Sequence, residues 1–206
     1  MNFDTLLNYI LDLLVNPVKE WERIREENTP DLKSLQQYLL NRLIPIIMLN
    51  VGTYFVGITF IGIRSKELID GARLVSPISA IVASIILAAA YFITIIIAGM
   101  IIKLIATSFD SEVNEINSFK LAAFSLYALL FFGSMHIIPG MKVGMLAGFY
   151  GIYLLYRGLP VLLKTPPEKC AGFTLVVSLA VIGMLSLAFS LVNTISGAGP
   201  LLRIGF

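Results

Sequence analysis

Long apolar stretches without acidic residues recur along most of the chain and are separated by short polar segments. An α-helix needs about 20 mostly apolar residues to cross the roughly 30 Å hydrocarbon core of a bilayer. The stretches that reach or approach this length are residues 43–63, 74–102, 121–138, 143–163 and 171–195. The pattern therefore predicts an all-α, polytopic membrane domain of five transmembrane helices over 43–195, followed by a short tail over 196–206.

Residues 1–42 show a different pattern, that of helices with one apolar face. Between Phe3 and Leu14 the apolar residues recur at helical spacing, whereas Asp12 lies off that stripe. Such a segment forms a short amphipathic helix lying on the membrane surface. We expect residues 1–42 to be a cytoplasmic amphipathic or interfacial region, which serves either for structural docking or for a function of its own.

Two further helix starts follow within this region. Asn16 before Pro17 is typical of an N-cap followed by the first helical residue. The helix that Pro17 opens carries Trp21 among charged residues, and an indole is a natural anchor at the level of the lipid headgroups. The Thr29-Pro30-Asp31 segment repeats the cap signal and predicts a third helix that continues toward the first span.

Composition supports a membrane protein and excludes several other classes. The chain is 57% hydrophobic and 14% charged, and its mean hydropathy is +0.87. A soluble domain carries about 25% charged residues. The net charge of +2 gives no basis for a nucleic-acid partner, so the lipid bilayer is the expected one. One cysteine and one histidine exclude a disulfide framework and any zinc or iron–sulfur site built from several such ligands.

Basic residues in the short connecting loops indicate the orientation, because they are retained on the cytoplasmic side. They are more numerous on the side of the amino terminus than on the opposite side. The residues on the amino-terminal side are Lys19, Arg23, Arg25, Lys33, Arg42, Lys103, Lys120, Lys164 and Lys169. We therefore expect a cytoplasmic amino terminus and, with an odd number of spans, an external carboxyl terminus.

The predicted spans offer little chemistry for catalysis or for proton-coupled transport. They contain no Asp or Glu, and a proton relay normally places an acid near the midplane. Ser134 and His136 are two residues apart on a helix and point in nearly opposite directions, so they do not form a serine protease pair. The sequence also lacks H-E-x-x-H and phosphate-loop motifs. We expect no enzyme, no catalytic residue, no cofactor and no metal.

The fourth predicted span carries a row of small residues. Gly140, Gly144 and Gly148 recur at every fourth position, and Gly151 lies close to the same face. Rows of this kind let the backbones of membrane helices approach closely. The row predicts either packing inside the protomer or the seam of a homo-oligomer.

A polar stripe of Tyr150, Tyr153 and Arg157 lies roughly opposite these glycines. In one interpretation, Arg157 extends its side chain to the membrane surface and serves as an anchor. In the other, it forms an internal site with the two tyrosines or with Asn50, or it meets an anion. Together with His136, which we expect at a helix interface, these residues are the candidate functional or partner-binding residues.

The loop before the last span is short and rich in proline. Its motif residues are Lys164, Thr165, Pro166 and Glu168. Thr165 and Glu168 have the spacing of a capping box, with Pro166 at the first helical position. We expect this loop to start the last helix sharply.

The stretch Gly151-Ile-Tyr-Leu-Leu-Tyr-Arg-Gly-Leu-Pro-Val-Leu-Leu-Lys-Thr-Pro-Pro-Glu-Lys169, followed by Ala171-Gly-Phe-Thr174, resembles the carboxyl-terminal half of the Yip domain. Asn16-Pro17 with Trp21 is similar to the family's opening, and Ile138-Pro139-Gly140 to its third turn. The resemblance covers about residues 15–195. This family comprises the Ypt/Rab-GTPase-interacting multi-pass membrane proteins and their bacterial and archaeal relatives.

The resemblance implies five spans, a cytosolic amino terminus and no known catalysis. Eukaryotic members are associated with Golgi and endoplasmic-reticulum trafficking and with Rab GTPases. This sequence lacks their Asp-Leu-Tyr-Gly-Pro type motif and has Leu129 and Leu130 where prolines are often found. A Rab partner is therefore implied only for a eukaryotic protein. The prokaryotic-type branch, in a bacterial or archaeal cytoplasmic membrane, is the closer match.

Two functions remain after this reasoning. The first is a non-enzymatic membrane protein that scaffolds or organises the bilayer or binds a protein partner. The second is a small channel or transporter, for anions, that uses Arg157 and the tyrosine stripe. The absence of acids in the spans and the amino-terminal helices favour the first function.

Overall fold

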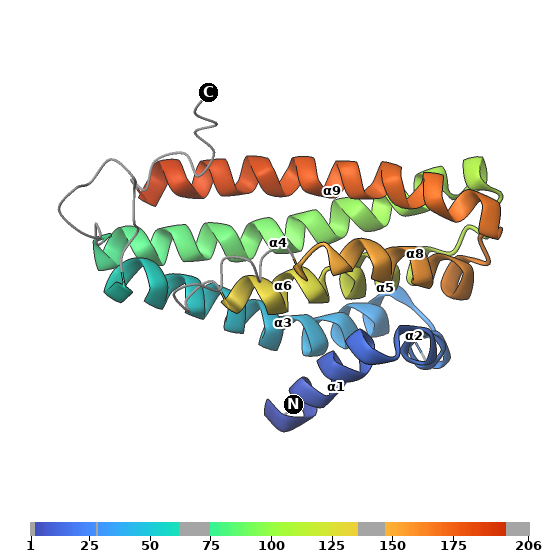
Figure 1. The fold of residues 1–206 in the computed structure, drawn as a ribbon, viewed down its shortest axis with the longest axis horizontal. Coiled ribbons are helices and arrows are strands. Elements are labelled where there is room, and N and C mark those ends of the chain that lie inside the picture. The colour runs from blue at the N-terminus through green and yellow to red at the C-terminus, as the bar shows by residue number, and fades with distance from the viewer. Residues whose placement is uncertain (1–2, 28, 62–74, 136–146, 197–206) are drawn as a thin grey trace.

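A computed structural model describes residues 3–27, 29–61, 75–135 and 147–196, and its regular elements over these residues are all helices (Figure 1). The α-helices are α1 Phe3–Val15, α2 Pro17–Glu26, α3 Leu32–Val56, α4 Pro77–Ile105, α5 Glu115–Ser125, α6 Tyr127–Ser134, α8 Tyr150–Leu163 and α9 Pro167–Ser196. A π-helical turn, Gly57–Ile61, extends α3, and a 3-10 turn, Ala106–Phe109, follows α4. The predicted all-α class is confirmed.

Four helical stretches among the described residues are long and apolar enough to cross a membrane. They are Leu32–Phe60, Pro77–Phe109, Glu115–Ser134 and Pro167–Ile195. The predicted span 143–163 corresponds to α8, whose 14 residues make it a shorter apolar helix. It would be about 21 Å long. The chain is therefore a multi-pass membrane protein with four helices of spanning length in its described part.

Local sequence signals explain where several helices begin. The third helix predicted from Thr29-Pro30-Asp31 is α3; its N-cap is Asp31, which forms a reciprocal capping box with Ser34. Asn114 caps α5 through its side chain, which accepts a hydrogen bond from the Asn117 amide. Pro17 is the first residue of α2, as predicted, although the Asn16 side chain makes no capping hydrogen bond. Because α3 runs without interruption from Leu32, residue 42 does not mark the end of a structural element.

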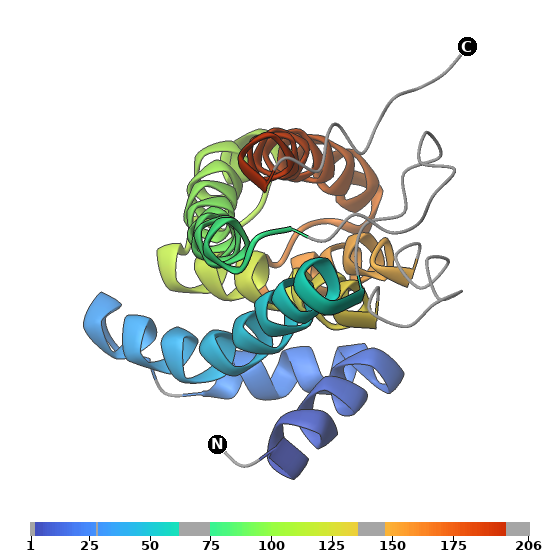
Figure 2. The same cartoon turned by 90° about the vertical axis from the view of Figure 1, so that its left-hand side faces the viewer.

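The long helices lie side by side; α4 runs opposite to its neighbours α3, α5 and α9, whereas α3 and α6 run in the same direction (Figure 1). In the end view α4 and α9 lie together on one side of α5, and the pair α1 and α2 lies on the other side, beyond α3 (Figure 2). Helix α8 packs mainly against α5 and α2. The amino-terminal helices are thus part of the bundle's own packing.

The apolar face of α1 is covered by protein. Tyr9, Ile10 and Leu13 are buried, and the Tyr9 ring lies 5.8 Å from the rings of both Phe124 and Tyr127. The sequence predicted a helix lying on the membrane surface. The described part of α1 instead buries this face against α5 and α6, because these helices present aromatic side chains that it can pack on.

Candidate functional site

Trp21 ties α2 to α8 inside the protein. Its side chain is fully buried, and the indole Nε1 donates a hydrogen bond of 3.1 Å to the Leu154 carbonyl. The ring fits because Gly158 has no side chain: a Cβ there would lie 2.8 Å from the indole and 2.5 Å from Leu121. The prediction that Trp21 anchors the protein at the lipid headgroups is therefore wrong. A buried indole needs a hydrogen-bond acceptor, and α8 supplies one.

Lys120 fixes the carboxyl end of α2. It is 1% exposed, and its Nζ donates hydrogen bonds to the carbonyls of Ile24, at 2.9 Å, and Glu27, at 3.0 Å. These carbonyls lie at the carboxyl end of α2, where the helix dipole favours a cation. Lys120 on α5 thus acts as a C-cap supplied by another helix.

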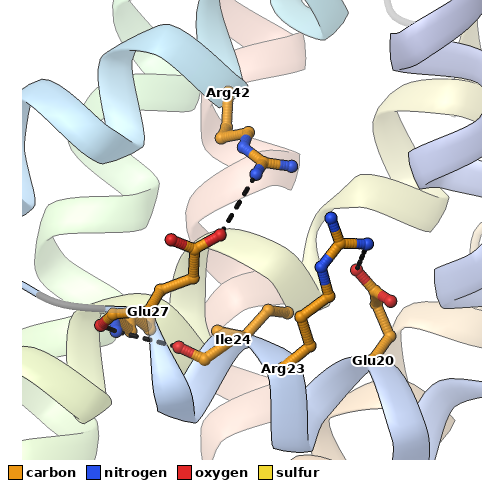
Figure 3. Close-up of polar contacts among 6 residues, drawn as sticks. Glu20, Arg23, Ile24, Glu27 and Arg42 are labelled. Atoms are coloured by element: carbon orange, nitrogen blue, oxygen red, sulfur yellow. Dashed lines mark hydrogen bonds and ion pairs between the residues drawn. The ribbon is translucent and has the colours of Figure 1, made fainter.

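Arg42 links α1, α2 and α3 at the same place. Its Nη2 lies 3.4 Å from the Glu27 Oε1, an ion pair visible in Figure 3. The guanidinium carbon lies 4.3 Å from the centre of the Tyr9 ring, which is a cation–π arrangement. The Arg42 carbonyl also accepts a hydrogen bond of 2.7 Å from the Tyr127 hydroxyl. The charge of Arg42 is therefore shared between a carboxylate and an aromatic face.

Glu20 is the acid that this packing buries most. Its residue is 4% exposed, and its ion-pair partner is Arg23 at 3.5 Å, drawn in Figure 3. Burial raises the pKa of the Glu20 carboxyl, and the Arg23 charge partly opposes this effect. The outward face of α2 remains exposed and carries charges of both signs. Its exposed charged residues are Lys19, Glu22, Arg23 and Glu26, whereas the exposed Arg25 donates a hydrogen bond of 3.4 Å to the Val161 carbonyl of α8.

The tyrosine stripe of α8 lies against α1. The Tyr150 hydroxyl donates a hydrogen bond of 2.7 Å to the Leu14 carbonyl, and the rings of Tyr150 and Tyr153 are 5.1 Å apart. Tyr153 is 42% exposed, and Arg157 is half-buried. Among the described residues, Arg157 makes no hydrogen bond or ion pair.

Asn50 forms a separate polar contact between α3, α4 and α6. Its Nδ2 donates to the Leu130 carbonyl at 2.8 Å, and its Oδ1 accepts from the Tyr91 hydroxyl at 2.9 Å. The side chain is 3% exposed, so these bonds satisfy a polar group in an apolar environment. The structure does not bring Asn50 and Arg157 together.

The described glycines of the predicted row face the interior of the protomer. A Cβ at Gly151 would lie 2.5 Å from the Ser125 carbonyl oxygen, so α8 and α5 touch through their backbones. Gly148 is buried and lines a cavity between the helices. Gly140, Gly144 and His136 lie outside the described residues.

The loop after α8 is joined to the loop after α4 by ion pairs and a hydrogen bond. The Lys164 Nζ lies 2.6 Å from the Glu112 Oε1, and Lys169 pairs with Asp110. Between these ion pairs the hydroxyls of Thr165 and Ser111 are 2.9 Å apart. We call this arrangement the loop clasp.

Thr165 therefore has a different role from the predicted one. Its hydroxyl lies 3.3 Å from the Leu159 carbonyl and contacts Ser111, so it does not form a capping box with Glu168. Thr165 is 2% exposed. Helix α9 begins at Pro167, one residue later than the capping box would place its first turn. The loop still starts the last helix sharply, because the second proline serves as its first residue.

Sequence reasoning missed Lys120, Arg42 and the loop acids as structural residues. They stand beside predicted spans, where they were counted only as charges that set the orientation. Tertiary packing decides their role, because each meets a partner from another element of the fold. Within the described ranges no group of three His, Cys, Asp or Glu side chains could hold a metal ion.

These observations define a multi-pass, all-helical membrane protein whose amino-terminal helices are packed on its own bundle. The family model described as the Yip1 domain matches residues 11–190, and the chain therefore belongs to the Yip family. The resemblance seen in the sequence is thus confirmed. No curated protein and no solved structure matches the chain.

Proposed function

We propose that this protein is a non-enzymatic membrane scaffold that presents the outward face of α2 to a protein partner. One observation carries the proposal: α2 is held at its middle and at its carboxyl end by buried contacts. Trp21 bonds α8, and Lys120 bonds the carbonyls at the helix end. A surface that is ordered before binding loses little conformational entropy when a partner docks.

The chemistry of α2 separates a held inner face from a free outer face. Trp21 and Ile24 are buried, whereas Glu22 and Glu26 are exposed and point to the opposite side of the helix. Charges of both signs on an exposed face favour a specific partner through electrostatic complementarity. We place this face in the cytoplasm of a bacterial or archaeal cell, and we do not extend Rab binding to this chain.

The test is quantitative cross-linking in native membranes, read by mass spectrometry, with Glu22→Lys as the variant. Asp12→Lys is the matched control, because Asp12 is an exposed acid on the neighbouring helix α1. We expect Glu22→Lys to lose a cross-linked partner that Asp12→Lys retains, while Trp21 emission stays unchanged in both. Identical cross-linking patterns for the wild type and the two variants would refute the proposal.

The second candidate is a small anion channel or transporter. Its support is that Arg157 makes no hydrogen bond or ion pair with another described residue. The exposure of Tyr153 and the distinct contacts of Asn50 count against a common path through the bundle. Anion flux from liposomes that hold the purified protein decides between the two functions. A selective flux that Arg157→Leu abolishes would favour the channel.

A further inference from the structure

A cavity of about 270 Å³ lies between α4, α5, α6, α8 and α9. Its wall is almost entirely apolar. Residues that represent its sides are Ala98, Ile102, Leu129, Leu155, Val181 and Leu185. An apolar cavity of about 150 Å³ inside a protein is already large enough to hold benzene. This space therefore accommodates a segment of hydrocarbon chain.

The packing of the helices explains why the space exists. Gly151 brings α8 onto the backbone of α5 at Ser125, and Gly148 adds no side chain to fill the gap. Helix α9 packs mainly on α4, away from this contact. The cavity is the volume left between the α4–α9 pair and the α5–α8 pair.

The rim of the cavity reaches the outer surface of the bundle. Phe149 on the α8 side is 57% exposed, and Ile182 on α9 is 42% exposed. Both are large apolar residues on the flank of helices long or apolar enough to lie in a membrane. An occupant can therefore enter sideways from the bilayer without crossing water.

Two serine hydroxyls in the cavity wall have no hydrogen-bond partner among the described residues. They belong to Ser125, which is 8% exposed, and to Ser178, and the Oγ atoms of both are buried. Serines in helices commonly satisfy this group on a backbone carbonyl of the preceding turn. Ser118 does so with the Asn114 carbonyl, and Ser134 does so with that of Phe131. The two cavity serines instead leave a donor available to an occupant.

The two hydroxyls lie at a similar depth. Ser125 is about 15 Å along α5 from its start at Glu115, and Ser178 is about 16 Å along α9 from its start at Pro167. Both helices start at the same end of the bundle, as Figure 1 shows. Lys120 stands about 7 Å before Ser125 on α5, so the hydroxyls lie just inside the level of that cation. Glycerolipids place their ester carbonyls and first methylenes just below the charged headgroups.

We propose that the cavity binds one acyl chain of a membrane glycerolipid, whose ester carbonyl accepts a hydrogen bond from Ser125 or Ser178. The apolar wall, the volume, the lateral opening and the two free donors at one depth fit this single occupant. The described wall residues include no charged group for a phosphate, so the headgroup stays outside. This site is independent of the partner surface on α2.

The test uses purified protein in vesicles of phosphatidylethanolamine and phosphatidylglycerol that contain a phosphatidylglycerol with a diazirine on one acyl chain. After irradiation, mass spectrometry maps the labelled residues. We expect label on Leu155 and Val181 in the wild type, and its loss in Ser178→Phe, which fills the cavity. Ser186→Phe, an exposed position on the same helix, is the matched control and should keep the label. Label confined to outward residues such as Leu179 in the wild type would overturn the proposal.

A second measurement tests the hydroxyls without adding bulk. An ester-linked phosphatidylglycerol should compete for the cavity about threefold to tenfold better than its ether-linked analogue in the wild type. In the double variant Ser125→Ala/Ser178→Ala the two competitors should become equal. A preference that persists in the double variant, or that is missing in the wild type, would overturn the assigned hydrogen bond.

Discussion

Replacing Lys120 by methionine should release the carboxyl end of α2 from the bundle. Methionine keeps most of the length and apolar volume of the side chain but removes the ammonium. The carbonyls of Ile24 and Glu27 then lose the donor that they share, at 2.9 and 3.0 Å. The Ile24 residue is 1% exposed, so water has little access to its carbonyl unless the helix end moves.

The magnitude follows from these contacts. Leaving a buried acceptor without its donor costs about 1–3 kcal/mol, and hydrogen bonds to charged groups lie in the upper part of this range. Burying the ammonium of Lys120 costs free energy, and the variant avoids this cost. The saving offsets the loss of about one of the two hydrogen bonds. We expect a net loss of about 2 kcal/mol, or roughly a 30-fold larger population of undocked α2.

Lys103→Met is the matched control, because the same substitution removes a lysine that is paired with an acid near the same end of the bundle. The Lys103–Glu115 pair is 2.9 Å long, but its side chains are 41% and 40% exposed. Such a pair contributes at most about 1 kcal/mol, which is screened by solvent. The loss of this pair should leave α2 docked.

Hydrogen exchange of the α2 amides in nanodiscs measures the opening directly, because protection reports the free energy of local unfolding. Trp21, the only tryptophan of the chain, adds a fluorescence signal from the same helix. Exchange should be roughly 30-fold faster in Lys120→Met and within about fivefold of wild type in Lys103→Met. Equal protection of α2 in the two variants would refute the assigned role of Lys120.

Three further predictions concern packing, charge and pH. Gly151→Ala should lower thermal stability in detergent by about 1–3 kcal/mol, because its Cβ would meet the Ser125 carbonyl, whereas Gly183→Ala, with open space around it, should be neutral or stabilising. Burial raises the pKa of the Glu20 carboxyl, so its protonation contributes stability that is present below the unfolded-state pKa of about 4.3 and is lost as pH rises through the folded-state pKa. Glu20→Gln should therefore be at least as stable as wild type at pH 7 and should flatten the pH dependence in chemical unfolding; a less stable variant at pH 7 would contradict this. Arg157→Leu should perturb stability or anion flux more than Arg157→Lys, and a null effect of both would remove Arg157 from the candidate residues.

The sequence predicted helices well where a single segment contains its own signal. Apolar stretches located the spanning helices, and the Thr29-Pro30-Asp31 segment indicated the start of α3. These features depend on local composition and capping chemistry. The fourth predicted span differs in kind, because α8, its counterpart in the structure, is shorter than the length that a crossing needs.

The contacts between helices could not be predicted in the same way. The periodicity of α1 and α2 correctly indicated which faces are apolar, but not that protein covers the faces of Tyr9 and Trp21. Likewise, the pattern could not show that Asn50 meets Tyr91 and Leu130 rather than Arg157. Helical periodicity identifies a buried face, whereas the neighbour on that face depends on the packing of the whole bundle.

The loop clasp gives a structural role to Lys164 and Thr165, which belong to the stretch that resembles the Yip domain. Lys164 and Asp110 both adopt a left-handed backbone conformation, with φ of 50° and 51°, which costs a side-chain-bearing residue about 1–2 kcal/mol. Each of these residues ends a helical segment. The two turns are joined by a backbone hydrogen bond of 2.8 Å, which the Glu112 amide donates to the Leu163 carbonyl.

The exposed ion pairs of the clasp contribute little by themselves, because solvent screens them. The backbone bond and the buried contact between Ser111 and Thr165 are therefore the stronger links. They join the α4–α5 connection to the α8–α9 connection, so each strained turn is fixed by the other. In this chain the motif residues Lys164 and Thr165 thus serve first to hold two helix pairs in register, and the same register fixes the wall of the cavity between those pairs.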